Sequence, residues 1–283
     1  MGRISDFFRR SRRVTDDAPT QQLRRPVPQA PILVGNVQGI GAREGQEDSF
    51  ALVNASDPEA MARRGVFAVV ADGMGGLADG KAISEAAVDG FLQLFQTLDE
   101  TGDVPRQLLT GTCAINDALF QRFGGRSGTT AVAVWILRDR LHWISVGDSA
   151  IFLMRHGGVF QVNREHTRLN ELYLEELSRE PSDPARAESD EDARRLSAFL
   201  GMPELREADC NRRPFLLCPG DVLLLCSDGI SGVLTPAELR EAMRLPPDAG
   251  CRLLETLVLE KGLPAQDNFT GTMISIQSIN GRE

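Results

Sequence analysis

Apolar residues along positions 32–279 fall into short runs that predict strands and longer amphipathic stretches that predict helices. The expected strands occupy residues 32–40, 48–54, 65–72, 129–137, 141–146, 151–155, 159–162, 213–217, 221–226 and 269–276. Helices are expected at 79–98, 105–123 and 248–261, and another begins after the capping box of Thr235 and Glu238. Very short turns at 138–140 and 156–158 predict an antiparallel meander over 129–162, because parallel crossovers need longer connections.

The order of these elements indicates an α+β fold, with helix pairs inserted after the first strands and before the last strand. Two packed antiparallel sheets, covered by helices on both outer faces, would bury the apolar runs. Residues 163–209 interrupt this pattern, because they are charged, contain Pro181 and Pro184, and hold only two short expected helices, near 168–178 and 190–200. We therefore expect one domain over residues 32–279, with 163–209 as an excursion over its surface.

Residues 1–31 differ in composition from the rest of the chain. They are polar and rich in Arg and Pro, which predicts a flexible tail. Seven Arg and three Asp give residues 1–33 a charge of about +4, although the whole chain carries −9, so the remainder is strongly acidic and argues against a nucleic-acid partner. Ile4, Phe7 and Phe8 beside these arginines leave an alternative open, an amphipathic helix that contacts an acidic partner or an anionic membrane surface.

The cysteines and the hydropathy of the chain indicate the cellular compartment in which the protein is expected. No apolar run approaches the roughly 20 residues that span a membrane, and the N-terminus lacks the apolar region of a secretory signal. The five cysteines are scattered, without the spacing of a disulfide framework or a zinc site. We expect a cytoplasmic protein with free thiols.

The candidate chemistry lies in acidic residues beside the predicted strands. These residues are Glu47, Asp48, Asp72, Asp148, Asp228 and Asp267. A single Asp-Gly pair after a strand is ordinary turn chemistry, but several acidic strand ends in one domain indicate that these ends converge on a shared site. Because no Cys or His accompanies the carboxylates, the set suits Mg²⁺ or Mn²⁺.

The glycines after Asp72 leave a nucleotide site open as an alternative. Residues 75–82 nearly match the phosphate-binding loop G-x-x-x-x-G-K-[ST], but Ala82 replaces the hydroxyl that would hold Mg²⁺. Residues 73–78 fit a loose dinucleotide fingerprint, although Asp72 would repel a pyrophosphate. No G-x-S-x-G elbow is present, so a Ser-His-Asp hydrolase is not expected.

Six short motifs stand in sequence over residues 33–279. They are Gly41-Ala42-Arg43 with Gln46-Glu47-Asp48, Val70-Ala71-Asp72-Gly73-Met74-Gly75-Gly76, Ser127-Gly128-Thr129-Thr130-Ala131, Val146-Gly147-Asp148-Ser149, Cys226-Ser227-Asp228-Gly229-Ile230 and Asp267-Asn268-Phe269-Thr270. Together they resemble the bacterial branch of the metal-dependent serine/threonine protein phosphatases of type 2C. The resemblance implies a central antiparallel β-sandwich flanked on both sides by helix pairs, in four α-β-β-α layers.

The resemblance also implies a metal centre with two Mn²⁺ or Mg²⁺ ions. By position, Asp72 would bridge both ions and the Gly73 carbonyl would ligate one of them. Asp228 and Asp267 would ligate the other ion. Asp148, together with Asp228, would form the third metal site seen in bacterial members.

Around this centre, the resemblance implies that Glu47 and Asp48 hold metal-bound waters and that Arg43 binds the substrate phosphate. The implied reaction is hydrolysis of phosphoserine and phosphothreonine on proteins by a hydroxide that bridges the metals, in a monomeric enzyme that reverses a Ser/Thr kinase. Residues 163–209 would include a flap near the site. 

Three positions depart from the family pattern. Gln46 replaces an Asn, Met74 stands where eukaryotic relatives carry a His, and Ala150 replaces an Arg. With Met74 in place of the His, no residue is assigned as the general acid that protonates the leaving group. A catalytically weak, phosphatase-like module that binds phosphoproteins is therefore the alternative function.

Overall fold

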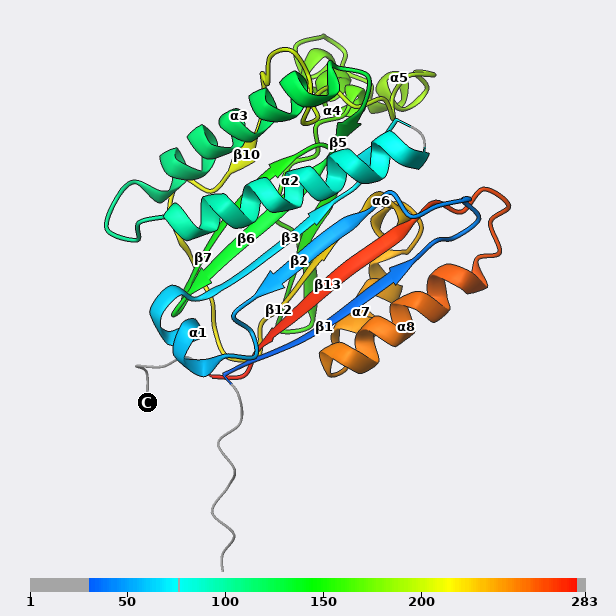
Figure 1. The fold of residues 1–283 in the computed structure, drawn as a ribbon. Helices are drawn as coiled ribbons and strands as arrows, with labels where there is room; N and C mark the ends of the chain where they lie inside the picture. The colour runs from blue at the N-terminus through cyan, green and yellow to red at the C-terminus, as the bar shows by residue number, and fades with distance from the viewer. Residues whose placement is uncertain (1–30, 76, 279–283) are drawn as a thin grey trace, which may run out of the picture.

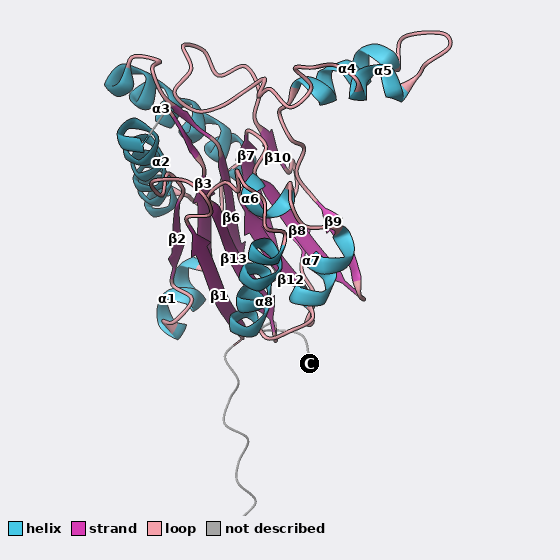
Figure 2. Ribbon diagram, turned by 90° about the vertical axis from the view of Figure 1, so that its right-hand side faces the viewer, coloured by secondary structure: helices cyan, strands magenta, loops and turns pink. Residues whose placement is uncertain are grey.

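The computed structural model describes residues 31–75 and 77–278. Within this part of the chain, two antiparallel sheets pack face to face, and helices cover the outer face of each (Figures 1 and 2). This arrangement has the four α-β-β-α layers expected from the sequence, so the predicted α+β sandwich is confirmed. 

The sheets bring together strands that are distant in the sequence. In the described residues, the first sheet has the order β1 (Ile32–Gly39), β13 (Phe269–Ile276), β12 (Val222–Cys226), β8 (Ala150–Arg155) and β9 (Gly158–Gln161). The second has the order β10 (Asp209–Cys210), β7 (Arg140–Val146), β6 (Ala131–Leu137), β3 (Val66–Ala71) and β2 (Ser49–Val53), with β11 (Phe215–Leu216) also paired to β7. A small ribbon joins β4 (Gly73–Met74) to β5 (Gly128–Thr129).

Two pairs of helices form the outer layers. They are α2 (Leu77–Thr97) with α3 (Val104–Phe123), and α7 (Pro236–Met243) with α8 (Pro247–Glu260). The shorter helices are α1 (Pro58–Arg64), α4 (Arg168–Glu176), α5 (Pro184–Glu188) and α6 (Asp228–Ser231). In Figure 1, α2 and α3 lie on one side of the strands and α7 and α8 lie on the other, and in Figure 2, α4 and α5 project beyond the sheets.

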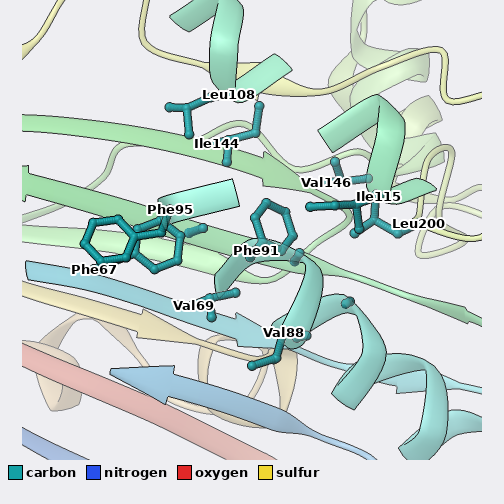
Figure 3. Packing of buried hydrophobic residues seen from close by; sticks show 14 of the residues in the cluster. Phe67, Val69, Val88, Phe91, Phe95, Leu108, Ile115, Ile144, Val146 and Leu200 are labelled. Carbon is teal, nitrogen blue, oxygen red and sulfur yellow. The ribbon is translucent and has the colours of Figure 1, made fainter. Parts of the chain in front are cut away.

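Strand β3 is buried on both faces, which explains its unbroken apolar sequence. Phe67 and Val69 pack against α2 and α3, whereas Val66 and Val70 face the first sheet, because successive strand side chains point in opposite directions. Figure 3 shows the layer beneath the helices, where the ring of Phe95 from α2 lies beside that of Phe67. The centroids of these two rings are 4.9 Å apart. A third apolar layer fills the space between the first sheet and α7 and α8.

The predicted meander over residues 129–162 is wrong. Strands β6 and β7 form a hairpin in one sheet, and β8 and β9 form a hairpin in the other. The chain changes sheets at Gly147, whose φ of +97° is in a region that favours glycine. Short connections therefore did fix antiparallel pairs, but a sharp turn between two hairpins can direct them into different sheets.

The expected helix at residues 190–200 is also wrong. The helix in this region is α5, and residues after it form turns and short bridges to the body of the protein. Ala193, Ala198 and Leu200 are nevertheless buried, so these turns pack against the body of the protein. By contrast, the helices expected at 79–98, 105–123 and 248–261 correspond to α2, α3 and α8.

The predicted tail at residues 1–31 lies outside the described residues, except for Pro31. The Pro31 carbonyl accepts a hydrogen bond from the Gln277 amide at 2.8 Å. No helix within residues 31–75 and 77–278 is both long enough and apolar enough to cross a membrane.

Candidate active site

A cavity of about 950 Å³ lies where strand ends and turns meet at one end of the sandwich. Figure 1 shows this end, where the first turn of α2 lies near α6. Acidic residues from five separate places in the chain line it, namely Glu47 of the β1–β2 turn, Asp72 after β3, Asp148 between β7 and β8, Asp228 at the start of α6 and Asp267 before β13. We call these five residues the acidic cluster.

The backbone of Asp72 is fixed by the neighbouring strand ends. Its amide donates to Thr130 Oγ1 at 3.2 Å, and its carbonyl accepts from the Thr130 amide at 2.9 Å and from Thr129 Oγ1 at 2.8 Å. Thr130 Oγ1 lies 2.7 Å from Ser149 Oγ, which is next to Asp148 in the chain. This buried network links the strand ends that carry Asp72 and Asp148, while the Asp72 carboxylate remains directed at the cavity.

Gly73 occupies a position that no larger residue could fill. A Cβ atom there would collide with the carbonyl oxygen of Gly80 in α2 and would lie 2.7 Å from the carbonyl oxygen of Glu47. The close approach brings the first turns of α2 against both the β1–β2 turn and the chain after Asp72. The glycine of the Asp-Gly pair is therefore required for packing at the cavity wall.

Asn268 holds the β1–β2 turn next to Asp267. Its Oδ1 accepts a hydrogen bond from the Glu47 amide at 2.7 Å. Its Nδ2 donates to the carbonyl oxygens of Ile40 at 2.8 Å and Gly45 at 3.0 Å. Three bonds from one buried side chain thus bring together two segments that are more than 200 positions apart in the sequence.

Asp48 lies behind the cavity wall and not in it. The side chain is fully buried, and its Oδ2 accepts a hydrogen bond from Ser227 Oγ at 2.8 Å. Among the residues that the structure describes, Asp48 Oδ1 has no hydrogen-bond partner, and neither does Asp228 Oδ1. Buried carboxylate oxygens without donors are costly, so both atoms have unused capacity to bind a cation or its water.

Arg43 forms an ion pair with the acidic cluster. Its Nη2 lies 2.6 Å from Asp267 Oδ2, and both side chains are partly exposed. The guanidinium can donate to other oxygens as well, because it carries five N–H groups. In this arrangement one carboxylate of the cluster is neutralised by an arginine.

The carboxylates of the site repel one another. Burial raises the pKa of Asp72 well above its usual range, and the charges of Asp48, Asp228, Asp148 and Asp267 raise it further. Burial, with a smaller contribution from Asp228, raises the pKa of Asp148 to about 7. A divalent cation would reverse this penalty, because it favours the charged carboxylates.

The donor chemistry therefore fits a divalent cation, although the ligands are not arranged around one. No group of three or more His, Cys, Asp or Glu within residues 31–75 and 77–278 stands in a geometry ready to hold a metal ion. The pairing of Asp267 with Arg43 is one reason, since it turns a carboxylate oxygen toward the guanidinium. Hard oxygen ligands, two oxygens without donors and mutual repulsion are nevertheless the properties that Mg²⁺ or Mn²⁺ would satisfy.

The structure brings nearly all residues predicted for the site into the same cavity. Those that line it are Arg43, Glu47, Asp72, Gly73, Asp148, Asp228 and Asp267. Asp48 is the exception, because its carboxylate is fully buried and bonded to Ser227 Oγ. Sequence reasoning gave no role to Thr130 and Asn268, although both stand in the quoted motifs, and it gave no signal for Arg126, Arg194 and Arg195, which also line the cavity.

Comparisons with known proteins agree with this fold. The family model of protein phosphatase 2C matches residues 33–179. The serine/threonine protein phosphatase PstP of Mycobacterium tuberculosis is 27% identical over 226 residues, which is 77% of this chain, and the chain spans only 42% of PstP. The protein phosphatase PhpP of Streptococcus pneumoniae is 26% identical over 216 residues, which covers 74% of this chain and 85% of PhpP.

Solved structures give the same result. The crystal structure of the Mycobacterium tuberculosis serine/threonine phosphatase PstP/Ppp matches with a TM-score of 0.71 at 25% identity, covering 87% of this chain and 99% of that chain. The family model covers more than half of the sequence, and the fold extends the match beyond it. The chain belongs to the protein phosphatase 2C family.

Proposed function

We propose that the chain is a metal-dependent phosphatase that hydrolyses phosphoserine and phosphothreonine on proteins and so reverses a Ser/Thr kinase. The observation that carries this proposal is the convergence of the acidic cluster on one cavity in a chain of the protein phosphatase 2C family. Phosphoprotein substrates are the expected partners, and the free cysteines of the described chain support a reducing, cytoplasmic setting.

The acidic cluster would hold the metal ions. Asp72 and the Gly73 carbonyl would serve one Mn²⁺ or Mg²⁺ ion, and Asp72, Asp228 and Asp267 the second. Asp148 would serve a third ion. When bound, the ions would supply a water of lowered pKa and positive charge beside the phosphoryl oxygens.

The protein's own residues would position the substrate and the waters. Arg43 can bind two phosphoryl oxygens through its planar fork, and its exposure leaves it accessible to a substrate. Glu47 and Asp48 would accept hydrogen bonds from waters of the site, and Asn268 would keep the turn that carries them in place. We assign the domain to residues 32–279, with 163–209 as the flap, because Arg194, Arg195, Leu196 and Phe199 line the cavity.

The test is hydrolysis of p-nitrophenyl phosphate by the full chain with Mn²⁺ and with EDTA. We expect turnover that requires the metal and that falls by about a thousandfold in Asp228→Ala, since several kcal/mol of charge stabilisation would be lost. Asp190→Ala removes an exposed acid outside the cavity and is the matched control.

Turnover that persists in EDTA, or an unimpaired Asp228→Ala, would contradict the metal assignment. If the folded protein binds Mn²⁺ and phosphopeptides without turnover, the alternative of a phosphoprotein-binding module is correct.

A further inference from the structure

The cavity carries a second set of charged residues that the proposed chemistry does not use. Arg126 from the loop after α3, and Arg194 and Arg195 from the excursion, line the same cavity as the acidic cluster. We call these three residues the arginine group. Leu196 and Phe199 line the cavity beside them and add apolar surface.

The backbone around the arginine group is tied to the acidic end of the sandwich. Arg126 lies two residues before β5, which pairs with β4 immediately after Asp72. The Arg195 carbonyl accepts a hydrogen bond from the Arg168 amide at 2.8 Å. Further along, Leu200 and Thr129 exchange two backbone hydrogen bonds, of 3.0 and 2.8 Å. The three arginines therefore stand at defined positions relative to the acidic cluster.

The guanidinium groups of the arginine group are available for binding. All three residues are exposed, and none of them forms an ion pair with another residue in the described part of the chain. In the described residues, the acids at 190–192 form no ion pair with the arginine group, and the Arg195 amide donates to the Asp192 carbonyl at 2.8 Å. Glu44 also lines the cavity, from the β1–β2 turn.

The volume of the cavity exceeds what a single phosphorylated side chain needs. At about 950 Å³ it lies at the upper end of the roughly 300–1,000 Å³ that enclose drug-sized ligands. Residues on either side of the phosphorylated position would therefore enter it as well. Because the chain carries a net charge of −9, acidic flanking residues would be repelled unless positive groups met them inside the cavity.

We propose that the arginine group binds anionic side chains next to the phosphorylated residue, so that the enzyme selects acidic phosphopeptides. The proposal rests on the proposed phosphatase function and names its substrate class. Guanidinium groups suit this role, because their planar fork pairs with a carboxylate or with a second phosphate through two parallel hydrogen bonds.

The test compares phosphothreonine peptides flanked on both sides by Glu or by Gln. In wild-type protein with Mn²⁺ we expect kcat/KM to be about tenfold higher for the Glu peptide, as one charge-assisted hydrogen bond can supply. In the triple variant Arg126→Gln, Arg194→Gln, Arg195→Gln, the ratio of the two kcat/KM values falls close to one. The matched control, Arg106→Gln, Arg140→Gln, Arg252→Gln, removes the same charge from exposed positions outside the cavity and keeps the ratio.

A third peptide distinguishes the two sources of negative charge. It carries phosphoserine in place of one flanking Glu. A kcat/KM higher than that of the Glu peptide assigns the subsite to a second phosphate. A lower kcat/KM assigns it to carboxylates. Equal kcat/KM for Glu and Gln peptides in the wild type, or a preference that survives in the triple variant, would overturn the proposal. Failure of the phosphatase function itself would show separately, as absent turnover of p-nitrophenyl phosphate.

Discussion

The acidic cluster and the excursion of residues 163–209 contribute to one cavity in contrasting ways. The acidic cluster stands on strand ends whose positions are set by sheet register and by buried hydrogen bonds, such as those exchanged between Thr130 and Asp72. The excursion consists of two short helices and turns, and α4 is supported by partly exposed ion pairs from Arg168 to Glu171 and Glu175. Pairs near the surface contribute little to stability.

This difference fits the two proposed roles, metal binding by the acidic cluster and peptide selection by the arginine group. Groups that bind metal ions must be held in narrow geometry, and sheet register with buried polar groups fixes the backbone that carries the acidic cluster. Groups that select a peptide tolerate more movement, so an exposed segment anchored at its ends is sufficient. The anchors of the excursion are therefore where its structure depends most on the body of the protein.

The largest expected effect tests this anchoring. Leu200 is fully buried beneath the helices, whereas Leu177 in the excursion is 77% exposed. Leu200→Ala should lower the free energy of unfolding by about 2–5 kcal/mol, because it removes buried methyl groups and leaves a cavity. Leu177→Ala should change it by less than about 0.5 kcal/mol. Urea denaturation of both variants measures the difference.

Equal destabilisation by the two substitutions would mean that the excursion packs as tightly as the sandwich. A Leu200→Ala variant that is stable but no longer distinguishes Glu from Gln peptides would instead show that the anchor acts on selection alone.

The sequence predicted the acidic cluster better than the excursion, for a physical reason. Strands buried on both faces, such as β3, appear as continuous apolar runs, so an Asp at their end is conspicuous. In the excursion, Ala193, Ala198 and Leu200 are buried by turns, and no periodic pattern separates such turns from a helix.

Contacts between residues distant in the sequence could also not be predicted from the sequence. The change of sheet at Gly147 depends on a turn conformation, and the pairing of Arg43 with Asp267 joins positions 224 apart. Neither leaves a local pattern. The motifs nevertheless contained Thr130 and Asn268, whose roles in positioning Asp72 and the β1–β2 turn became evident only from their hydrogen bonds.

A second prediction concerns Arg43, which pairs with Asp267 and is proposed to bind the substrate phosphate. Arg43→Ala should lower kcat/KM for p-nitrophenyl phosphate by about a hundredfold, because two charge-assisted hydrogen bonds to phosphate are lost. It should also tighten Mn²⁺ binding, since Asp267 no longer pairs with the guanidinium. Titration calorimetry with Mn²⁺ measures the second effect independently of turnover.

Arg43→Lys sharpens this test. A lysine keeps the positive charge but lacks the planar fork, so it should restore only part of the turnover. Weaker Mn²⁺ binding in Arg43→Ala would show that the arginine supports Asp267 as a ligand and does not compete for it.

The smallest expected effect is a pH dependence in the metal-free protein. Burial raises the pKa of Asp48 to about 6, and hydrogen bonds from Thr270 and Ser227 lower it only in part. Because the folded pKa lies above the unfolded value of 3.8, the charged form is disfavoured in the fold. The contribution of Asp48 to stability is thus greatest below about pH 4 and is lost as the pH rises through about 6. Between about pH 5 and about pH 7.5, this single group should lower the free energy of unfolding by roughly 1 kcal/mol.

Urea denaturation in EDTA at both pH values, for wild type and Asp48→Asn, measures this contribution. The asparagine can still accept the hydrogen bond from Ser227 Oγ but cannot ionise, so its stability should fall by roughly 1 kcal/mol less than that of the wild type over the same interval. Mn²⁺ should reduce the loss in the wild type, because a bound cation favours the charged carboxylates around it. An identical pH dependence in the two proteins would place the titrating group in the acidic cluster instead, where Asp148 has a pKa raised to about 7.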